Sequence, residues 1–321
     1  MSAFDRRSFL RTATAGTALA PLLGAASVRT AAPAAAAPTR HGATAEFRWL
    51  GTSGWRVDIG EHTVLVDPYL SRFDTGMFGE DGFKPGTELK VDATAIADNV
   101  GDPDVVLVTH GHWDHFNDVP HIATTTGARV IGTPTVVNLA AAMDVKSDQL
   151  SHVRGGEVLD FGAYTVEVVA SLHSRNKSHS IALSGWHLTP PARRPATVAD
   201  LPEGDTLAFQ LTVKGGPSVF FMGGSDFAER NVAGLKPDVA MIALPSTSAT
   251  HDYVPRLIRA LDKPRTVVPV HWDNFEVALK NPPVDATGDA MGPDEFAEIV
   301  RKAAPRTEVV RPEYLTPYHF G

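Results

Sequence analysis

Four potential metal ligands lie within six residues of this chain. Residues 109–115 read Thr-His-Gly-His-Trp-Asp-His, in a sequence with only 13 His in all. Alternate side chains of an extended segment point to the same side, so His110 and His112 can present two imidazoles to one ion. Asp114 and His115 follow where the chain turns and can reach a second, adjacent ion. Nitrogen and oxygen ligands of this kind are typical of zinc, with iron or manganese as alternatives.

The chain contains no Cys. This excludes disulfides, thiolate metal sites, iron–sulfur clusters and Cys nucleophiles, so a transition metal must be held by His and carboxylates. A serine hydrolase is not supported either, because no Gly-x-Ser-x-Gly turn is present.

Apolar runs bounded by turn residues predict the elements that position these ligands. The run at 104–109, directly before the His cluster, predicts a buried strand. Similar patterns predict strands at 46–50, 54–59, 63–66, 158–170, 206–213, 218–222, 239–244 and 266–270. Helices are predicted at 134–143, 227–235, 252–262 and 293–303. No linker divides the sequence, so we predict one domain over residues 38–321.

The N-terminal residues 1–37 resemble a twin-arginine export signal. Arg6 and Arg7 precede a mildly apolar run at 12–28, and small residues at 31–37 suit a signal peptidase. The alternative is an Ala-rich leader with a chance Arg pair. No later apolar run reaches the roughly 18 residues of a spanning helix, so no stable membrane span is expected. We expect a secreted or extracytoplasmic protein that engages the twin-arginine machinery, which moves folded proteins.

Composition and charge narrow the function classes. The chain is 43% hydrophobic and 21% charged, which is typical of a globular protein. Residues 1–37 carry four Arg and one Asp, so the formal net charge of −8 becomes −11 without them. An acidic protein of this kind is not expected to bind nucleic acid.

The 110–115 segment, placed after an apolar strand, resembles the signature of the metallo-β-lactamase-fold hydrolases. That resemblance implies an α/β fold, a four-layer αββα sandwich of two mixed β-sheets flanked by helices. It also implies two further ligands, His173 in Val-Ala-Ser-Leu-His and His271 in Val-Val-Pro-Val-His. The chain is most similar to the branch with L-ascorbate-6-phosphate lactonases and N-acyl-phosphatidylethanolamine phospholipases D.

Two Asp residues have alternative roles. Asp67, in Val-Leu-Val-Asp-Pro, matches the acidic residue that supports the metal ligands in this family; the alternative is a turn residue before Pro68. The family has a metal-bridging Asp directly after a Gly, whereas this chain reads Gly-Gly-Ser-Asp at 223–226. The displaced Asp226 either bridges the ions or caps the following helix. Without a bridge, the site could run with one ion.

The resemblance implies one ion at His110, His112 and His173, and another at Asp114, His115 and His271, with Asp226 spanning both. Paired ions of this kind lie about 3.5–4 Å apart and lower the pKa of a shared water from 15.7 toward roughly 7. The resulting hydroxide attacks a carbonyl or phosphoryl centre, with Asp114 as the acid/base partner and Asp67 orienting an imidazole.

Charged and His side chains near the ligands are candidates for substrate binding. Arg175 and Lys177 follow His173 closely and could read an anionic group, or belong to a solvated loop. His251 begins a helix beyond the strand at 239–244 and either lines the pocket or is a surface residue. The first function class is hydrolysis of an ester-like bond (lactone, phosphodiester or phospholipid) in a small-molecule or lipid-like substrate. The alternatives are a metal-binding protein without turnover and a β-lactamase-type amide hydrolase.

Overall fold

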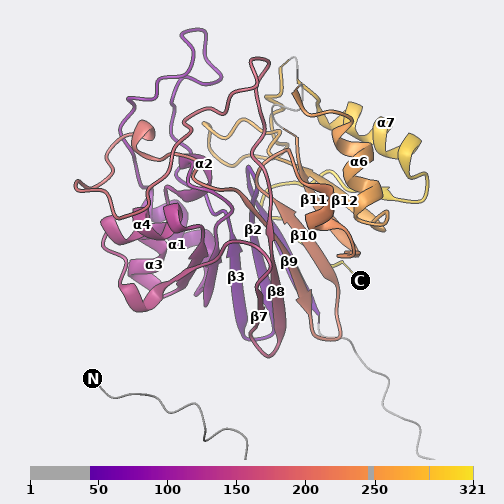
Figure 1. The fold of residues 1–321 in the computed structure, drawn as a ribbon, viewed down its shortest axis with the longest axis horizontal. Coiled ribbons are helices and arrows are strands. Elements are labelled where there is room, and N and C mark those ends of the chain that lie inside the picture. The colour runs from indigo at the N-terminus through magenta and orange to yellow at the C-terminus, as the bar shows by residue number, and fades with distance from the viewer. Residues whose placement is uncertain (1–43, 245–248, 289, 321) are drawn as a thin grey trace, which may run out of the picture. The chain divides into compact units, whose positions relative to one another are not determined.

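The computed structural model describes residues 44–244, 249–288 and 290–320, which form two β-sheets flanked by helices (Figure 1). Within these residues each sheet has seven strands. The first sheet has the order β14-β1-β2-β3-β4-β5-β6, with β1 (Ala45–Gly51), β2 (Gly54–Ile59), β3 (His62–Val66), β4 (Val105–Leu107), β5 (Arg129–Gly132), β6 (Leu150–His152) and β14 (Pro317–Tyr318).

The second sheet has the order β13-β12-β11-β10-β9-β8-β7. Its strands are β7 (Val158–Asp160), β8 (Tyr164–Ala170), β9 (Leu207–Val213), β10 (Ser218–Met222), β11 (Val239–Ala243), β12 (Thr266–Val270) and β13 (Glu308–Val309). Both sheets are mixed: β1 to β3 and β7 to β10 pair antiparallel, whereas β3 to β6 and β10 to β13 pair parallel.

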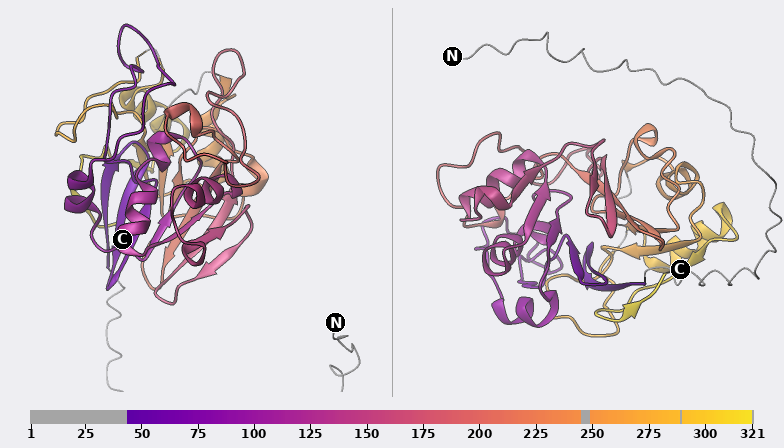
Figure 2. Two further views of the ribbon diagram at one scale, coloured as in Figure 1. Left: turned by 90° about the vertical axis from the view of Figure 1, so that its left-hand side faces the viewer. Right: turned by 90° about the horizontal axis from the view of Figure 1, so that it is seen from below.

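Helices cover the outer face of each sheet, which gives four layers (Figure 2). Those on the first sheet are α1 (Ala93–Val100), α2 (Trp113–Phe116), α3 (Val119–Thr126) and α4 (Pro134–Ala142). Those on the second sheet are α5 (Glu229–Val232), α6 (Tyr253–Ala260) and α7 (Pro293–Ala303). The predicted fold class is therefore confirmed.

Side-chain alternation along the strands builds two hydrophobic cores. In β3, Val64 and Val66 point into the core shared by the two sheets, whereas Leu65 packs under the helices. In β4, Val105 and Leu107 point toward the second sheet and Val106 toward the helices. A strand buried on both faces reads as a continuous apolar run, which is why these short strands are visible in the sequence.

The strand predictions are confirmed where apolar runs are uninterrupted, and helix α7 has the predicted bounds. One prediction is wrong: residues 158–170 form two strands, β7 and β8, joined by a turn at 161–163. Helix α5 is shorter than the predicted 227–235. The predictions missed α1, α3, β5, β6, β13 and β14, all of at most eight residues.

The predicted export signal, residues 1–37, lies outside the described residues. Among the residues that the structure does describe, no helix is both long enough and apolar enough to cross a bilayer.

Candidate metal centre

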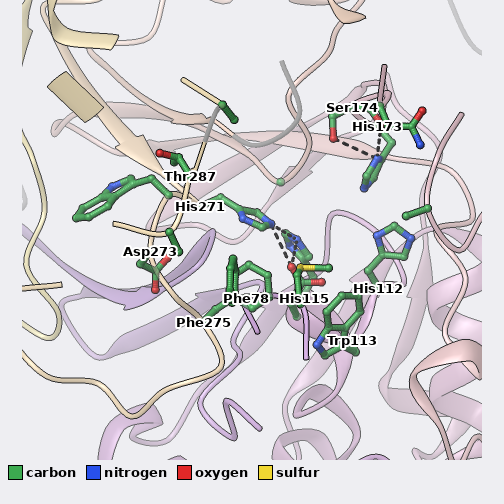
Figure 3. Close-up of a pocket in the computed structure, with 18 of the residues that line it drawn as sticks. Phe78, His112, Trp113, His115, His173, Ser174, His271, Asp273, Phe275 and Thr287 are labelled. Carbon is green, nitrogen blue, oxygen red and sulfur yellow. Dashed lines mark hydrogen bonds and ion pairs between the residues drawn. The ribbon is translucent and has the colours of Figure 1, made fainter. Parts of the chain in front are cut away.

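Three imidazoles from two distant segments form the first ligand group. His110 and His112 follow β4, His173 follows β8, and one ring nitrogen of each lies within 4.8 Å of the other two. His110 Nε2 is 3.2 Å from His112 Nδ1, and the His173 ring lies 4.8 Å from the His110 ring and 4.7 Å from the His112 ring. All three line one cavity, in which Figure 3 shows His112 and His173.

A carboxylate and two imidazoles form the second group. Asp114 and His115 lie on α2, and His271 follows β12. His271 Nε2 is 3.1 Å from Asp114 Oδ2 and 3.2 Å from His115 Nε2 (Figure 3). The segments meet because the carboxyl ends of β4, β8 and β12 lie at one edge of the sandwich. The structure thus brings together six of the seven residues predicted as ligands.

The spacing of these atoms fits a tetrahedral metal ion. Two ligand atoms at about 2.0–2.1 Å from a zinc ion are roughly 3.3 Å apart, close to the 3.1–3.2 Å separations found here. An imidazole must also be neutral to bind a metal. Burial lowers the pKa of His112 to about 3 and that of His173 to about 4, and it lowers the pKa of His110 as well.

The second group differs from the first in the direction of its imidazole pKa shift. Burial disfavours the charged form of His115, but the carboxylates of Asp114 and Asp67 outweigh it and raise its pKa to about 10. Burial likewise disfavours ionised Asp114, yet His115 and His271 hold its pKa below the usual value. A cation at this group would therefore displace the His115 proton, since metal binding requires a neutral imidazole.

Asp67 connects the metal ligands to the first sheet. Its buried carboxylate accepts hydrogen bonds from Thr109 N (2.7 Å) and Thr109 Oγ1 (2.6 Å), and its Oδ2 lies 2.8 Å from His115 Nδ1. The predicted role of Asp67, orienting a ligand imidazole, requires this contact with His115. A carboxylate on the far nitrogen fixes the tautomer, so His115 Nε2 faces His271.

Close backbone packing explains two glycines in the site. A Cβ on Gly111, between the first two ligands, would lie 2.3 Å from Pro202 O. A Cβ on Gly223, at the end of β10, would lie 1.9 Å from Thr109 Oγ1 and 2.9 Å from Asp67 Oδ2. Any side chain at Gly223 would therefore disturb the Asp67 contacts.

A buried ion pair fixes the segment after β12. His271 has φ +61°, and its N–H donates to Thr52 O (2.8 Å). Asp273, two residues on, accepts from Thr52 N (2.9 Å), Arg72 Nη2 (2.8 Å) and the hydroxyl of Tyr314 (2.8 Å). This network holds the left-handed backbone of His271, a conformation that costs energy in a non-glycine residue.

Asp226 does not join the ligands. Its Oδ1 accepts from Phe227 N (2.8 Å) and lies 3.5 Å from Arg256 Nη2, which directs the carboxylate toward α6. The prediction that Asp226 bridges two ions is therefore wrong for this structure, and it does not cap α5, whose N-cap is Ala228. The expectation that a shift of two residues keeps the same strand face does not apply to Asp226, because β10 ends at Met222.

The six ligands line a pocket of about 410 Å³. Of the predicted substrate-binding residues, Lys177 lines this pocket. Arg175 is exposed and donates to His179 O (2.9 Å), and His251 is exposed beside α6; neither lines the pocket. Both predictions were drawn from nearness in sequence to the strand ends, which does not determine where a loop side chain points.

Sequence reasoning missed several residues that shape the site. Thr109, Arg72 and Asp273 hold the ligand segments, and Met77, Phe78 and Phe275 form part of the pocket wall. Thr109 could have been found from its place beside the first ligand. The others lie in loops whose contacts depend on tertiary folding.

We expect Asp67→Asn to lower zinc affinity about 10–100-fold, because loss of a carboxylate behind a ligating imidazole has that effect. Zinc affinity is measured by competition with a chromophoric chelator. Asp226→Asn is the matched control, because Asp226 contacts Arg256 instead of the ligands, and it should bind zinc as the parent does. Equal affinity in Asp67→Asn and the parent would contradict the support role.

Comparisons with known proteins agree with this geometry. A family model described as "Beta-lactamase superfamily domain" matches residues 46–271. A UPF0173 metal-dependent hydrolase of Polynucleobacter asymbioticus is 28% identical over 268 residues, which cover 81% of this chain and 85% of the relative.

Solved structures support the same fold. Igni18, a metallo hydrolase from Ignicoccus hospitalis, has a TM-score of 0.55 and 20% identity, covering 87% of this chain and 99% of that chain. The metallo-beta-lactamase fold protein YhfI from Bacillus subtilis has a TM-score of 0.53 and 12% identity, covering 86% and 99%. Since the family model spans most of the sequence, the chain belongs to the β-lactamase superfamily and has the metallo-β-lactamase fold.

Proposed function

We propose that this protein is a metal-dependent hydrolase that cleaves an ester-like bond in a lactone, phosphodiester or phospholipid. Its UPF0173 relatives are named metal-dependent hydrolases. The observation that carries the proposal is the pair of ligand triads that line one pocket. Catalytic zinc sites have three protein ligands and keep one position open, whereas structural sites close with four.

The chemistry follows from the ligands that line the pocket. When bound, a metal ion here would polarise a carbonyl or phosphoryl oxygen and lower the pKa of water toward roughly 7. Asp114, whose Oδ2 faces His271 and His115, is the carboxylate placed to hold or accept a proton beside the reacting atoms. Asp67 holds the His115 ring through Nδ1, so that Nε2 stays turned toward the pocket.

We propose zinc as the metal, because five imidazoles and one carboxylate suit it; iron or manganese is the alternative. The two triads can hold two ions. Among the described residues no carboxylate is shared by both triads, since Asp226 contacts Arg256. The second ion would therefore depend on Asp114, His115 and His271 alone.

The position of Asp226 also favours one alternative, a metal-binding protein of the same fold without turnover. Without a carboxylate that bridges them, two metal ions would be held less tightly, and Asp226 does not supply that carboxylate. The alternative predicts bound metal without hydrolysis of lactones, phosphodiesters or β-lactams.

We expect His110→Ala to lose both bound metal and hydrolytic activity, because it removes one of three ligands from the first triad. Metal content is measured by atomic emission, and hydrolysis on a panel of lactones, phosphodiesters and β-lactams. His152→Ala is the matched control, because His152 is an exposed residue of β6. A metal-free His110→Ala variant with full activity would contradict the proposal.

We propose that residues 1–37 direct export of the folded protein through the twin-arginine machinery. Replacing the Arg pair (Arg6→Lys with Arg7→Lys) should keep the protein in the cytoplasm, as judged by cell fractionation. Arg11→Lys, outside the pair, is the control and should be exported normally. Normal export of the double variant would argue against this signal.

A further inference from the structure

We infer that this site selects substrates that carry an apolar alkyl or aryl group next to the scissile bond. The inference rests on the proposed hydrolase function and names its substrate class. It comes from an aromatic wall, defined here as Phe78, Trp113 and Phe275 with Met77 beside them, which lines the pocket that holds both ligand triads.

Phe275 contacts both of the other rings of the aromatic wall. Phe78 meets Phe275 edge-on with ring centroids 4.9 Å apart, and Trp113 lies 6.2 Å from Phe275. Phe275 and Trp113 are buried, whereas Phe78 is half-buried at the edge of the pocket. Figure 3 shows the three rings together on one side of the ligands.

The wall is adjacent to the ligand atoms. Phe275 packs edge-on against the ring of His271, with centroids 5.3 Å apart, and Trp113 lies 6.4 Å from the ring of His112. A substrate group bound next to both triads would therefore meet aromatic carbon. Removing its apolar surface from water favours binding in proportion to the area buried.

Glu276 fixes the loop that brings Phe78 to the pocket. Its carboxylate accepts hydrogen bonds from Thr75 N (2.8 Å), the Thr75 hydroxyl, Met77 N (3.3 Å) and Phe78 N (3.4 Å). Because Glu276 directly follows Phe275, one residue pair joins the loop at 75–78 to the segment after His271. The wall is thus built before substrate arrives, and ordering it costs little on binding.

The other side of the pocket is polar. Ser174, Asn176 and Lys177 line it next to His173, and Figure 3 shows Ser174 away from the aromatic wall. A pocket of about 410 Å³ lies at the small end of the range for ligand sites. This combination suits a small ester, lactone or phosphodiester with one apolar substituent and a polar remainder.

The first test compares γ-butyrolactone with γ-octalactone, which differ by one butyl group, on the zinc-loaded protein. Each buried methylene is worth about fourfold, so we expect kcat/KM to be at least about 10-fold higher for the longer lactone. Phe78→Ala should reduce that ratio at least fivefold, mainly through KM, and Phe78→Leu should restore most of it. Phe161→Ala is the matched control, a partly buried ring that stacks on Tyr164 and lies outside the pocket.

A second test does not depend on turnover. Calorimetry measures the affinity of the zinc-loaded protein for butanoate and octanoate, with circular dichroism to verify the fold of each variant. Octanoate should bind at least about 10-fold more tightly, with the same dependence on Phe78. If none of the lactones, phosphodiesters and β-lactams of the panel is hydrolysed but this length preference holds, the hydrolase function fails and the apolar selectivity stands. Affinities within twofold of each other, or a preference equal in Phe78→Ala and Phe161→Ala, would overturn the inference.

Discussion

The metal centre depends on one buried carboxylate, Asp67, at the end of β3. It fixes Thr109 by two hydrogen bonds and His115 by a third, so one side chain orients the start of the ligand segment and an imidazole from its helix. Buried charge is costly unless it is paired, and here the pairing is supplied by the imidazole that a metal ion would use. The close approach of Gly223 to both Thr109 and Asp67 extends this constraint to the second sheet. The end of β10 in the second sheet therefore packs closely against the Asp67 carboxylate of the first sheet.

The ligands at 110–115 were predictable from their residue types and spacing after an apolar strand, and the family resemblance added His173 and His271. His110, His173 and His271 come at or just after the carboxyl ends of strands whose β-branched runs are visible in the sequence, and such ends meet at one edge. Asp226 shows where that reasoning fails. It lies beyond the strand, in a segment where the backbone turns, and Arg256 on a separate helix determines the direction of its side chain. Sequence spacing carries no information on that contact.

The pocket wall was not predictable either, because it depends on contacts between residues far apart in the sequence. Phe78 and Phe275 are 197 positions apart, and Glu276 joins their segments by accepting hydrogen bonds from the backbone N–H groups of Thr75, Met77 and Phe78. Nothing in the composition of either loop indicates that partner. The strands determine the positions of the metal ligands, whereas contacts between loops determine which side chains form the pocket wall. Superfamily membership therefore establishes the fold, whereas the substrate depends on the residues that form the pocket wall.

Six side chains from separate segments converge into two triads of potential metal ligands. Anomalous diffraction at the zinc edge, on crystals of the zinc-loaded protein, tests this arrangement most directly. We expect two peaks in the pocket, one contacted by His110, His112 and His173, and the other by Asp114, His115 and His271. Zinc bound at other residues, or His173 and His271 turned away from the 110–115 segment, would contradict the account.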